Sequence, residues 1–429
     1  MRTKGEIAGV VDFGSREIRV LIARRDSEGT VRVIGHGTSP GPGCVHQGVI
    51  QDQNAAQVAL KHALAEAEKE ARVKVRSLFC GVGGTNVDTF IREGNVKLEH
   101  EVVEPTHLDE ALDIASRDVL AAGKRITSSI TAQEWYVDDL RVVDPVGIRG
   151  HILKTRVHLA RIPAVIEDNI ISCIESQRRE LEDVIFMPLA ASLGCLTPED
   201  MELGVAVLDM GRSTTGLAVY RDYRILGTHC FEWGGYHLTR DVSAGLQVSF
   251  EEADELIMEY GISEQFIASE FADGTGAEAV KKEKADEGAR IKLKTAVQGA
   301  PAIVERDELD LIIGERAKEL MTKVRQHLQV RGLMKNLVRG VVITGGAGSI
   351  KNQVRLAEAV FKVPCRLGLP THMESLPHDV NRPEFSSAVG LVRHAYDYRT
   401  AARNGRINDN GVMSKGFRKV GRLFKRYFF

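Results

Sequence analysis

The spacing of apolar and polar positions along the chain predicts an α/β fold. Short apolar runs at 7–12, 18–23 and 341–344 are bounded by glycines or polar residues, as strands are. Longer segments at 53–72 and 307–330 carry apolar residues at three- and four-residue spacing, which indicates helices. The same patterns predict strands at 31–35, 77–81, 150–160, 203–208 and 215–220, and helices at 108–121, 163–177, 236–246, 250–260 and 350–361. Strands that alternate with helices are typical of domains in which helices cover a sheet.

Composition narrows the class of protein. A length of 429 residues predicts two to four domains, and 43% hydrophobic with 27% charged residues is ordinary for a globular protein. The net charge of -2 argues against a nucleic-acid binder with a basic surface and against wholesale disorder. The six cysteines form no Cys-x-x-Cys pair, so we expect a reducing compartment without a disulfide framework or zinc cluster. We expect neither a signal peptide nor a membrane span, because no apolar run reaches about 18 residues.

Two similar glycine turns stand about 200 residues apart. In each, an aliphatic strand ends in Asp-x-Gly, first at Asp12 and Gly14 and again at Asp209 and Gly211, and hydroxyl residues follow. Glycine lets the backbone approach an oxygen closely, and successive N–H groups and hydroxyls donate to phosphate oxygens. The two aspartates can hold Mg²⁺, mostly through water. One such turn is usually an ordinary β-turn. Two copies predict a duplicated fold with half-sites facing each other across a cleft.

A third glycine turn follows the strand at 341–344. It contains Gly345, Gly346 and Ala347, and a predicted helix comes after it. Such a turn can bring backbone flat against a base or ribose, near a helix N-terminus. The alternative is a plain βα turn in which glycine avoids a clash. Beside the two hairpins, we favour an adenine contact.

In this order, the three turns resemble the phosphate 1, phosphate 2 and adenosine motifs of the actin/Hsp70/sugar-kinase superfamily. Further segments narrow the resemblance to the FtsA family of actin-like bacterial cell-division proteins. Residues 144–151 and 154–159 resemble that family's 1C subdomain, and 188–192 and 234–242 resemble the segments on either side of phosphate 2. The resemblance covers about residues 5–398 and, separately, the tail.

The resemblance implies an actin-like two-lobe ATPase fold with an FtsA-type 1C subdomain and a C-terminal amphipathic helix. FtsA proteins bind ATP with Mg²⁺ between the lobes and polymerise into actin-like protofilaments. They bind the C-terminal tail of the ring protein FtsZ and link to later division proteins. They are peripheral proteins on the cytoplasmic face of the anionic inner membrane, at the division septum. We expect the same here, with no nucleic-acid partner.

The resemblance also implies which residues surround the nucleotide, with Asp12 and Asp209 holding the metal through water. From the three turns and the segment at 234–242, these residues are Asp12, Gly14, Ser15, Arg16, Asp209, Gly211, Arg212, Ser213, Thr214, Gly234, Gly235, Gly345, Gly346, Ala347 and Ser349.

Several positions depart from the family pattern. Glu17 stands where phosphate 1 often carries a lysine, and Arg212 stands inside a loop that is often Gly-Gly-Gly-Thr. Gly216 replaces a frequent acidic residue, and Asp254 and Ile257 replace an adenosine-contacting Glu and Lys pair of some relatives. We expect nucleotide binding with slow or absent hydrolysis, because turnover needs compensated charge and a positioned water. No catalytic residue is assigned.

The resemblance divides the chain into subdomains. The expected bounds are 1–83, 162–202 and 380–399 for 1A, 84–161 for 1C, 203–245 and 301–379 for 2A, 246–300 for 2B, 400–411 for a polar linker and 412–429 for a membrane-targeting helix.

The tail shows a strong separation of residue types. On a helix, its apolar and aromatic side chains fall within an arc of about 160° and its basic side chains within an opposite arc of about 120°. From Gly411 to Phe429 there are six Lys or Arg and no Asp or Glu. This favours a helix in the interface of an anionic membrane over a helix packed on its own domain or a calmodulin-type target. The expected membrane contacts are Met413, Phe417, Arg418, Lys419, Val420, Arg422, Leu423, Phe424, Lys425 and Phe428.

Two other functions stay open. A pilus-assembly actin homologue such as PilM shares the fold and a 1C-type subdomain, but PilM-like chains lack the basic tail. A small-molecule kinase of the same superfamily needs a general-base aspartate facing a sugar pocket. The sequence offers no candidate for that base beyond Asp12 and Asp209.

Overall fold

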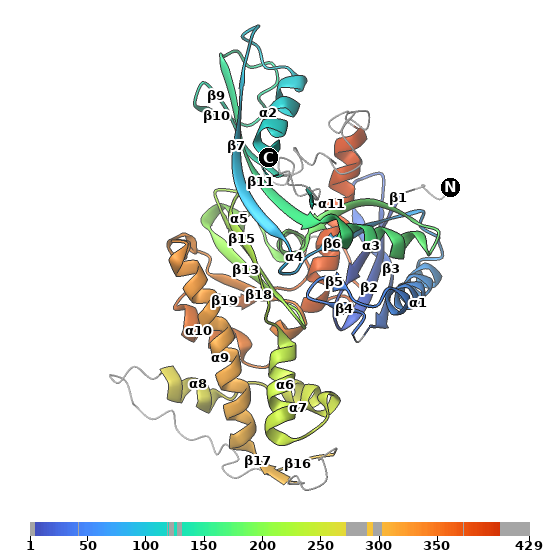
Figure 1. Cartoon of the computed structure of the whole chain (residues 1–429), viewed down its shortest axis with the longest axis vertical. Coiled ribbons are helices and arrows are strands. Elements are labelled where there is room, and N and C mark those ends of the chain that lie inside the picture. Colours follow the sequence, from blue (N-terminus) through green and yellow to red (C-terminus); the bar gives the residue numbers. More distant parts are fainter. Residues whose placement is uncertain are drawn as a thin grey trace.

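The computed structural model describes most of the chain as an elongated molecule built on three five-stranded sheets (Figure 1). The described residues are 5–41, 43–117, 119, 124–126, 131–271, 290–294, 303–371 and 373–403.

Two of the sheets have the same topology. The first has the order β12-β6-β1-β2-β3, and the second, read from the corresponding edge, has the order β19-β18-β13-β14-β15. Their strands are β1 Glu6–Phe13, β2 Glu17–Arg25, β3 Val31–Pro40, β6 Ser77–Val82, β12 Glu180–Phe186, β13 Val205–Met210, β14 Thr215–Arg221, β15 Arg224–Phe231, β18 Val341–Thr344 and β19 Cys365–Leu367. In each sheet the strand that ends in Asp-x-Gly is antiparallel to the next strand and parallel to a later one. The predicted duplication of an α/β unit is therefore confirmed.

The first sheet and the second sheet each form the centre of one lobe, called the first and the second lobe. Helices α4 Met187–Cys195 and α11 Ser386–Arg403 join these two lobes. They pack against each other between the sheets, as Figure 1 shows. The core around them takes apolar residues from both sheets, including Val10 and Phe79 from the first and Val207 from the second. Burial of one shared core ties the lobes together, because separating them would expose that apolar surface to water.

The outer helices cover the sheets and extend the second lobe. Helix α1 Gln53–Ala71 buries an alanine- and leucine-rich face on the first sheet, and the Asp52 side chain caps it by accepting from the Ala55 N–H at 2.9 Å. The others are α3 Ala164–Glu175, α5 Pro198–Leu203, α6 Gly235–Leu246, α7 Phe250–Tyr260, α8 Glu264–Phe271, α9 Arg306–Val330 and α10 Gln353–Phe361. Short strands β4 Val45–His46 and β5 Val49–Ile50 pair near α1, and β16 Arg290–Lys292 pairs with β17 Ile303–Glu305.

The third sheet forms a separate projection at the top of Figure 1. It has the order β10-β9-β11-β7, with β8 pairing β11, and helix α2 packs on it. The bounds are β7 Asp88–Lys97, α2 Pro105–Arg117, β8 Lys124–Ile126, β9 Thr131–Val137, β10 Leu140–Val142 and β11 Ile152–Pro163. It touches the second lobe at β15, where the hydroxyl of Thr228 lies 2.8 Å from His158 Nε2 and the Thr228 carbonyl accepts from the Thr89 hydroxyl at 3.2 Å.

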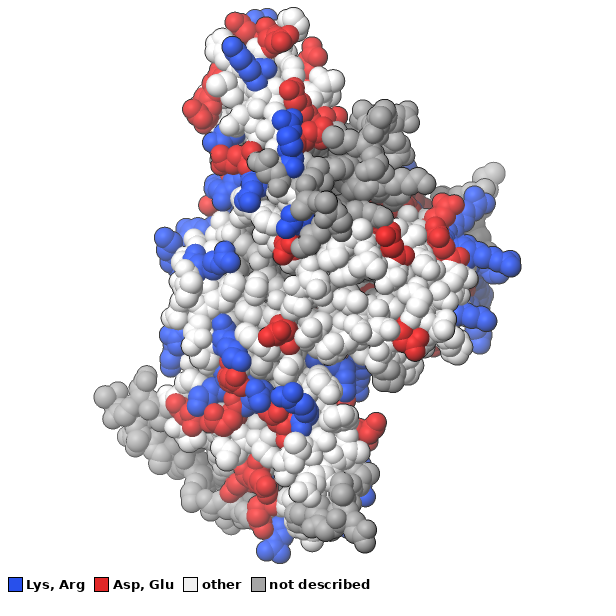
Figure 2. All heavy atoms as spheres, in the orientation of Figure 1, with Lys and Arg blue, Asp and Glu red and all other residues white. Residues whose placement is uncertain are grey.

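On the face drawn in Figure 2, many charged side chains lie close to a side chain of opposite charge. Acidic and basic side chains lie next to each other there, notably over the helices of the second lobe. Helix α9 takes part in several such pairs, among them Arg316 with Asp241, Lys318 with Glu270 and Lys323 with Glu319.

The predicted elements are found, with differences at their ends and some omissions. Helix α2 begins at Pro105 rather than 108, and the glycine turn after β18 is a short 3-10 helix, Gly346–Ser349. Strand β15 and helix α11 were not predicted. Residues 400–403, expected to open a polar linker, continue α11, because Thr400 and Arg403 are held by hydrogen bonds and ion pairs that the sequence pattern does not reveal.

The predicted membrane-targeting tail, 412–429, and linker residues 404–411 lie outside the described residues. Within the described part of the chain, none of the helices combines the length and the apolar character needed to cross a bilayer.

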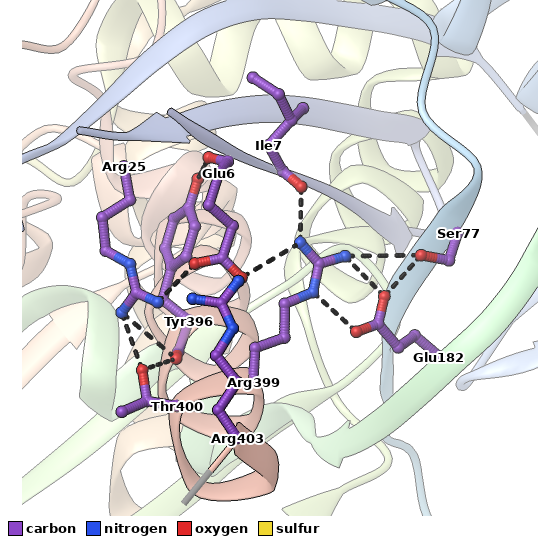
Figure 3. A network of polar contacts seen from close by, with 9 residues as sticks. All are labelled: Glu6, Ile7, Arg25, Ser77, Glu182, Tyr396, Arg399, Thr400 and Arg403. Carbon is purple, nitrogen blue, oxygen red and sulfur yellow. Dashed lines mark hydrogen bonds and ion pairs between the residues drawn. The ribbon is translucent and has the colours of Figure 1, made fainter. Parts of the chain in front are cut away.

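A polar network holds the C-terminal end of α11 against the start of β1 (Figure 3). The Arg399 guanidinium donates to both carboxylate oxygens of Glu182, at 2.7 and 2.6 Å, and to the Ile7 carbonyl at 2.5 Å. Glu6 accepts from Arg25 at 2.5 Å and from Arg403 at 2.8 Å. Bidentate bonds between Arg and carboxylate fix both partners in orientation, so the network holds the end of α11 in place against β1 and β12.

Arg399→Met is expected to lower the free energy of unfolding by about 2 kcal/mol, because Arg399 is largely buried and its charged hydrogen bonds are lost. Urea unfolding measures the change. Arg403→Met is the matched control, since the Arg403 side chain is 64% exposed and its pair with Glu6 is screened by water. Equal losses for the two variants would contradict this ranking.

Candidate functional site

The two Asp-x-Gly turns meet in one cavity between the lobes. The cavity holds about 1340 Å³ of empty space, part of it open solvent, and both turns line it. The Ser15 and Ser213 hydroxyls lie 2.7 Å apart across the gap, and Ser213 Oγ also accepts from the Gln47 N–H at 3.0 Å. The structure thus brings together two turns that are far apart in the sequence, as the half-site hypothesis predicts.

Most of the predicted nucleotide-binding residues line this cavity. Gly234 and Ser349 are the predicted residues absent from its lining. The lining residues among those predicted are Asp12, Gly14, Ser15, Arg16, Asp209, Gly211, Arg212, Ser213, Thr214, Gly235, Gly345, Gly346 and Ala347. Their role as ligands of a nucleotide stays a prediction.

Gly234 has a structural role next to the cavity. A Cβ on Gly234 would lie 2.5 Å from the Gly211 carbonyl oxygen and 2.6 Å from that of Arg212. Because of this close approach, the N–H groups of Gly235 and Tyr236 reach those two carbonyls, at 2.9 and 2.7 Å. The start of α6 therefore fixes the backbone of the β13–β14 turn.

Two carboxylates dominate the electrostatics of the cavity. Burial raises the pKa of Asp12 to about 6, nearby Arg19 opposes the rise, and the charge of Asp209 adds to it. Burial likewise raises the pKa of Asp209, although its carboxylate accepts from the Ser387 hydroxyl at 2.7 Å. Buried like charges disfavour ionisation, and a divalent cation would relieve both effects. The pair therefore fits a Mg²⁺ ion held by carboxylate oxygens and water.

The third turn completes one wall beside Asp209. Gly345 has φ +82°, and a Cβ there would lie 2.5 Å from Asp209 Oδ1. Only glycine tolerates both that backbone conformation and that contact without strain. The third turn thus places the backbone of Gly345 directly beside the carboxylate of Asp209.

The residues that depart from the family pattern have partners within the chain. Glu17 accepts from Arg19 at 2.6 Å, and Arg19 also contacts Asp12 at 3.5 Å. Arg212 donates to Asp254 at 2.7 Å. The misplaced charges are therefore compensated inside the protein.

Sequence reasoning missed several lining residues. Ser387, Arg19, Thr239, Glu384, Gly84 and Pro188 all line the cavity. Ser387 opens α11, and no glycine turn or phosphate motif marks it in the sequence. Alternation along β2 does carry one signal, because Arg19 stands between buried Ile18 and Val20 at the register position opposite Asp12.

Comparison with known sequences gives matches that carry one family name. The sequence model described as "Cell division protein FtsA" matches residues 206–390. A protein of that name from Pseudomonas aeruginosa is 27% identical over 391 residues, 91% of this chain and 89% of the relative. Another from Neisseria meningitidis serogroup B is 28% identical, covering 92% of this chain and 91% of the relative. The FtsA of Escherichia coli K12 is 25% identical, covering 90% and 89%. The resemblance to the FtsA family is confirmed.

Comparison with solved structures identifies the fold. A chain of the "PilM-PilN type IV pilus biogenesis complex" has a TM-score of 0.62 at 14% identity, covering 90% of this chain and 98% of that chain. MreB 5 of Spiroplasma citri bound to AMPPNP has a TM-score of 0.53 at 12% identity, covering 93% and 99%. The fold is therefore actin-like, as predicted.

Asp12→Asn is expected to raise the free energy of unfolding at pH 7 by on the order of 2 kcal/mol in metal-free buffer. The pKa of Asp12 in the folded state, about 6, exceeds the ordinary 3.8. Between these two pH values the native state keeps a proton that the unfolded state has released, and at pH 7 folding must bury the ionised carboxylate. Wild-type stability from this group is full below about pH 4 and is lost as the pH rises through about 6. Urea unfolding from pH 4 to 7 measures the difference between variant and wild type.

The control for that series is Asp139→Asn, on an exposed turn of the third sheet, which should keep the wild-type pH profile. Parallel curves for Asp12→Asn and wild type would show that folding does not hinder ionisation of Asp12.

Gly345→Ala is expected to lower the free energy of unfolding by about 2 kcal/mol, because alanine is strained at positive φ and its Cβ meets Asp209. Gly346→Ala is the matched control next to it. A Cβ at Gly346 would lie 4.0 Å from Glu384 Cβ, its nearest neighbour, so the substitution should change the free energy of unfolding by less than about 0.5 kcal/mol. Thermal unfolding compares the two variants. A larger loss of stability in Gly346→Ala than in Gly345→Ala would disprove the steric role assigned to Gly345.

Proposed function

Because the chain resembles the FtsA family over nine-tenths of its length, we propose that it is an ATP-binding, actin-like cell-division protein. It polymerises on the cytoplasmic face of the inner membrane at the septum and connects the FtsZ ring to that membrane. The amphipathic helix at 412–429 is the membrane anchor. FtsZ binds through its C-terminal tail, and later division proteins bind the assembled polymer.

The observation that carries the proposal is the meeting of Asp12 and Asp209 in one cavity between the lobes. In the proposed complex, the backbone N–H groups and hydroxyls of the two turns donate to the phosphates. The two aspartates hold Mg²⁺, which offsets phosphate charge when bound. The third turn, at Gly345 to Ala347, lies against the adenosine.

The proposed mechanism is assembly rather than turnover. A nucleotide contacts turns from both lobes, so its binding favours one relative placement of the lobes and hence one set of contacts between subunits. A polymer presents many tails to one membrane, and their weak individual affinities combine into strong attachment. ATP hydrolysis, which this mechanism does not require, is slow or absent.

The FtsA assignment is favoured over the two alternatives by separate observations. The relatives that cover about nine-tenths of this chain carry the FtsA name, whereas the likeness to a PilM chain, at 14% identity, concerns the fold. The basic amphipathic tail also fits an anchor better than a pilus-assembly homologue. For a sugar kinase, the carboxylates identified in the cavity are already part of the metal and phosphate sites or paired with arginines.

Removal of residues 411–429 is expected to abolish most liposome binding. In a co-pelleting assay with ATP and Mg²⁺, full-length protein should sediment with anionic vesicles, and a chain ending at Asn410 should stay in the supernatant. Each basic residue contributes on the order of 1 kcal/mol at an anionic surface, and burial of the aromatic face adds to this. Equal pelleting of both chains would overturn the anchor assignment.

Two controls separate the anchor from the rest of the proposal. Neutral phosphatidylcholine vesicles should capture much less full-length protein, because the electrostatic attraction is absent. Binding of a fluorescent ATP analogue by both chain lengths tests the cavity independently of the tail. If the full-length chain pellets with vesicles but binds no ATP analogue, the anchor assignment stands and the ATP-binding assignment is wrong.

A further inference from the structure

Arg212 joins the β13–β14 turn to the helical end of the second lobe. Its side chain leaves the turn and donates through Nη1 to Asp254 Oδ2, on α7, at 2.7 Å. Its guanidinium also lies 5.6 Å from the ring centre of Tyr236. Arg212 and Asp254 both line the cavity, with side chains 24% and 22% exposed. A ligand in the cavity can therefore reach this ion pair.

The backbone at Arg212 is fixed, so only its side chain is free to change partner. The Arg212 carbonyl accepts from the Tyr236 N–H at 2.7 Å, and the Gly211 carbonyl accepts from the Gly235 N–H at 2.9 Å. Gly234 leaves no space for the turn to shift toward α6. Reorientation of the guanidinium about its side-chain torsions costs little where the side chain is partly exposed.

Asp254 keeps a partner if Arg212 turns away. Its Oδ1 accepts from the hydroxyl of Thr239 at 2.5 Å, and Thr239 is buried on α6. The neighbouring Ala253, Leu256 and Ile257 pack into the core and hold α7 in place. Loss of the bridge therefore neither buries an unpaired charge nor unfolds α7.

For Arg212, the charge and geometry of a polyphosphate make it a stronger partner than the Asp254 carboxylate. The charged lining residues of the described chain are Arg16, Arg19 and Arg212 against Asp12, Asp209, Asp254 and Glu384. Arg19 is held by Asp12 and Glu17. A polyphosphate carries more negative charge than one carboxylate and accepts paired N–H donors from a guanidinium.

On the premise of the proposed function, we infer that Arg212 exchanges the Asp254 carboxylate for a phosphate oxygen when a nucleoside polyphosphate occupies the cavity. Asp254 is then a positioning residue that competes with the ligand for Arg212. The competition lowers affinity for polyphosphates and leaves the affinity for the nucleoside unchanged. Ligand binding also releases the link between the β13–β14 turn and α7.

The test measures ATP, ADP and adenosine affinities of the full-length chain by calorimetry with Mg²⁺. Asp254→Asn keeps an acceptor for Thr239 and removes the charge that holds Arg212, so ATP should bind about threefold tighter. Arg212→Gln should bind ATP about tenfold more weakly. The double variant should match Arg212→Gln, because Asp254 acts only through Arg212. Adenosine affinity should change in none of them.

The matched control is Asp241→Asn, which breaks the pair of Asp241 with Arg316 on α9. That pair is 2.5 Å long and its side chains are 24% and 25% exposed, but neither residue lines the cavity. ATP affinity of Asp241→Asn should equal that of wild type. Asp254→Ser, which also removes the charge, replaces Asp254→Asn if the latter does not fold by circular dichroism.

Three outcomes overturn the inference. Weaker binding of ATP and adenosine alike by Asp254→Asn would show that Asp254 holds the nucleoside itself. Unchanged ATP affinity would show that no competition exists. If wild type binds none of the three ligands, the inference falls together with ATP binding in the proposed function. If wild type binds ATP and either of the first two results is found, the inference is wrong and ATP binding in the proposed function still stands.

Discussion

The placement of two partly or fully buried carboxylates in one cavity is the constraint on which the rest of the structure depends. Asp12 and Asp209 end corresponding strands of two sheets with the same topology. Each would be unfavourable there without compensation, because burial raises the pKa of both. Arg19 offsets part of the cost at Asp12, and the Ser387 hydroxyl does so at Asp209. Stability given up at such a position is common where a protein binds a ligand that restores it.

The shared core keeps the carboxylates of Asp12 and Asp209 in place relative to each other across the two lobes. Apolar residues of both sheets pack on α4 and α11, so neither lobe has a fully separate interior. The two turns touch across the cavity through a polar contact, that between Ser15 and Ser213. The lobes are thus joined by apolar packing at the core and by polar contacts at the cavity. A ligand that exchanges those polar contacts for its own would leave the packing of the core in place.

The sequence was sufficient for those parts of the site that backbone geometry determines. Asp-x-Gly turns and the Gly345 turn need glycine for steric reasons, so their pattern is visible without a structure. The duplicated strand order follows from the same repeats. Ser387 and the bond between Arg212 and Asp254 could not be predicted, because they depend on which helices pack beside the cavity. Helix α11 was missed for a related reason: its end is held by Glu6 and Glu182, which lie far away in the sequence.

Helix α11 runs from the cavity to Arg403, the last described residue of the chain. At its start Ser387 donates to Asp209, and near its end Arg399 binds the Ile7 carbonyl and Glu182. Strand β1 also connects the cavity to the polar network at the end of α11, because it carries Asp12 near one end and Glu6 at the other. Both elements are buried over most of their length, so the end of α11 is held in a defined position relative to the cavity. In the proposed function, each subunit would therefore hold Arg403, which precedes the proposed linker and anchor, at the same position relative to the cavity.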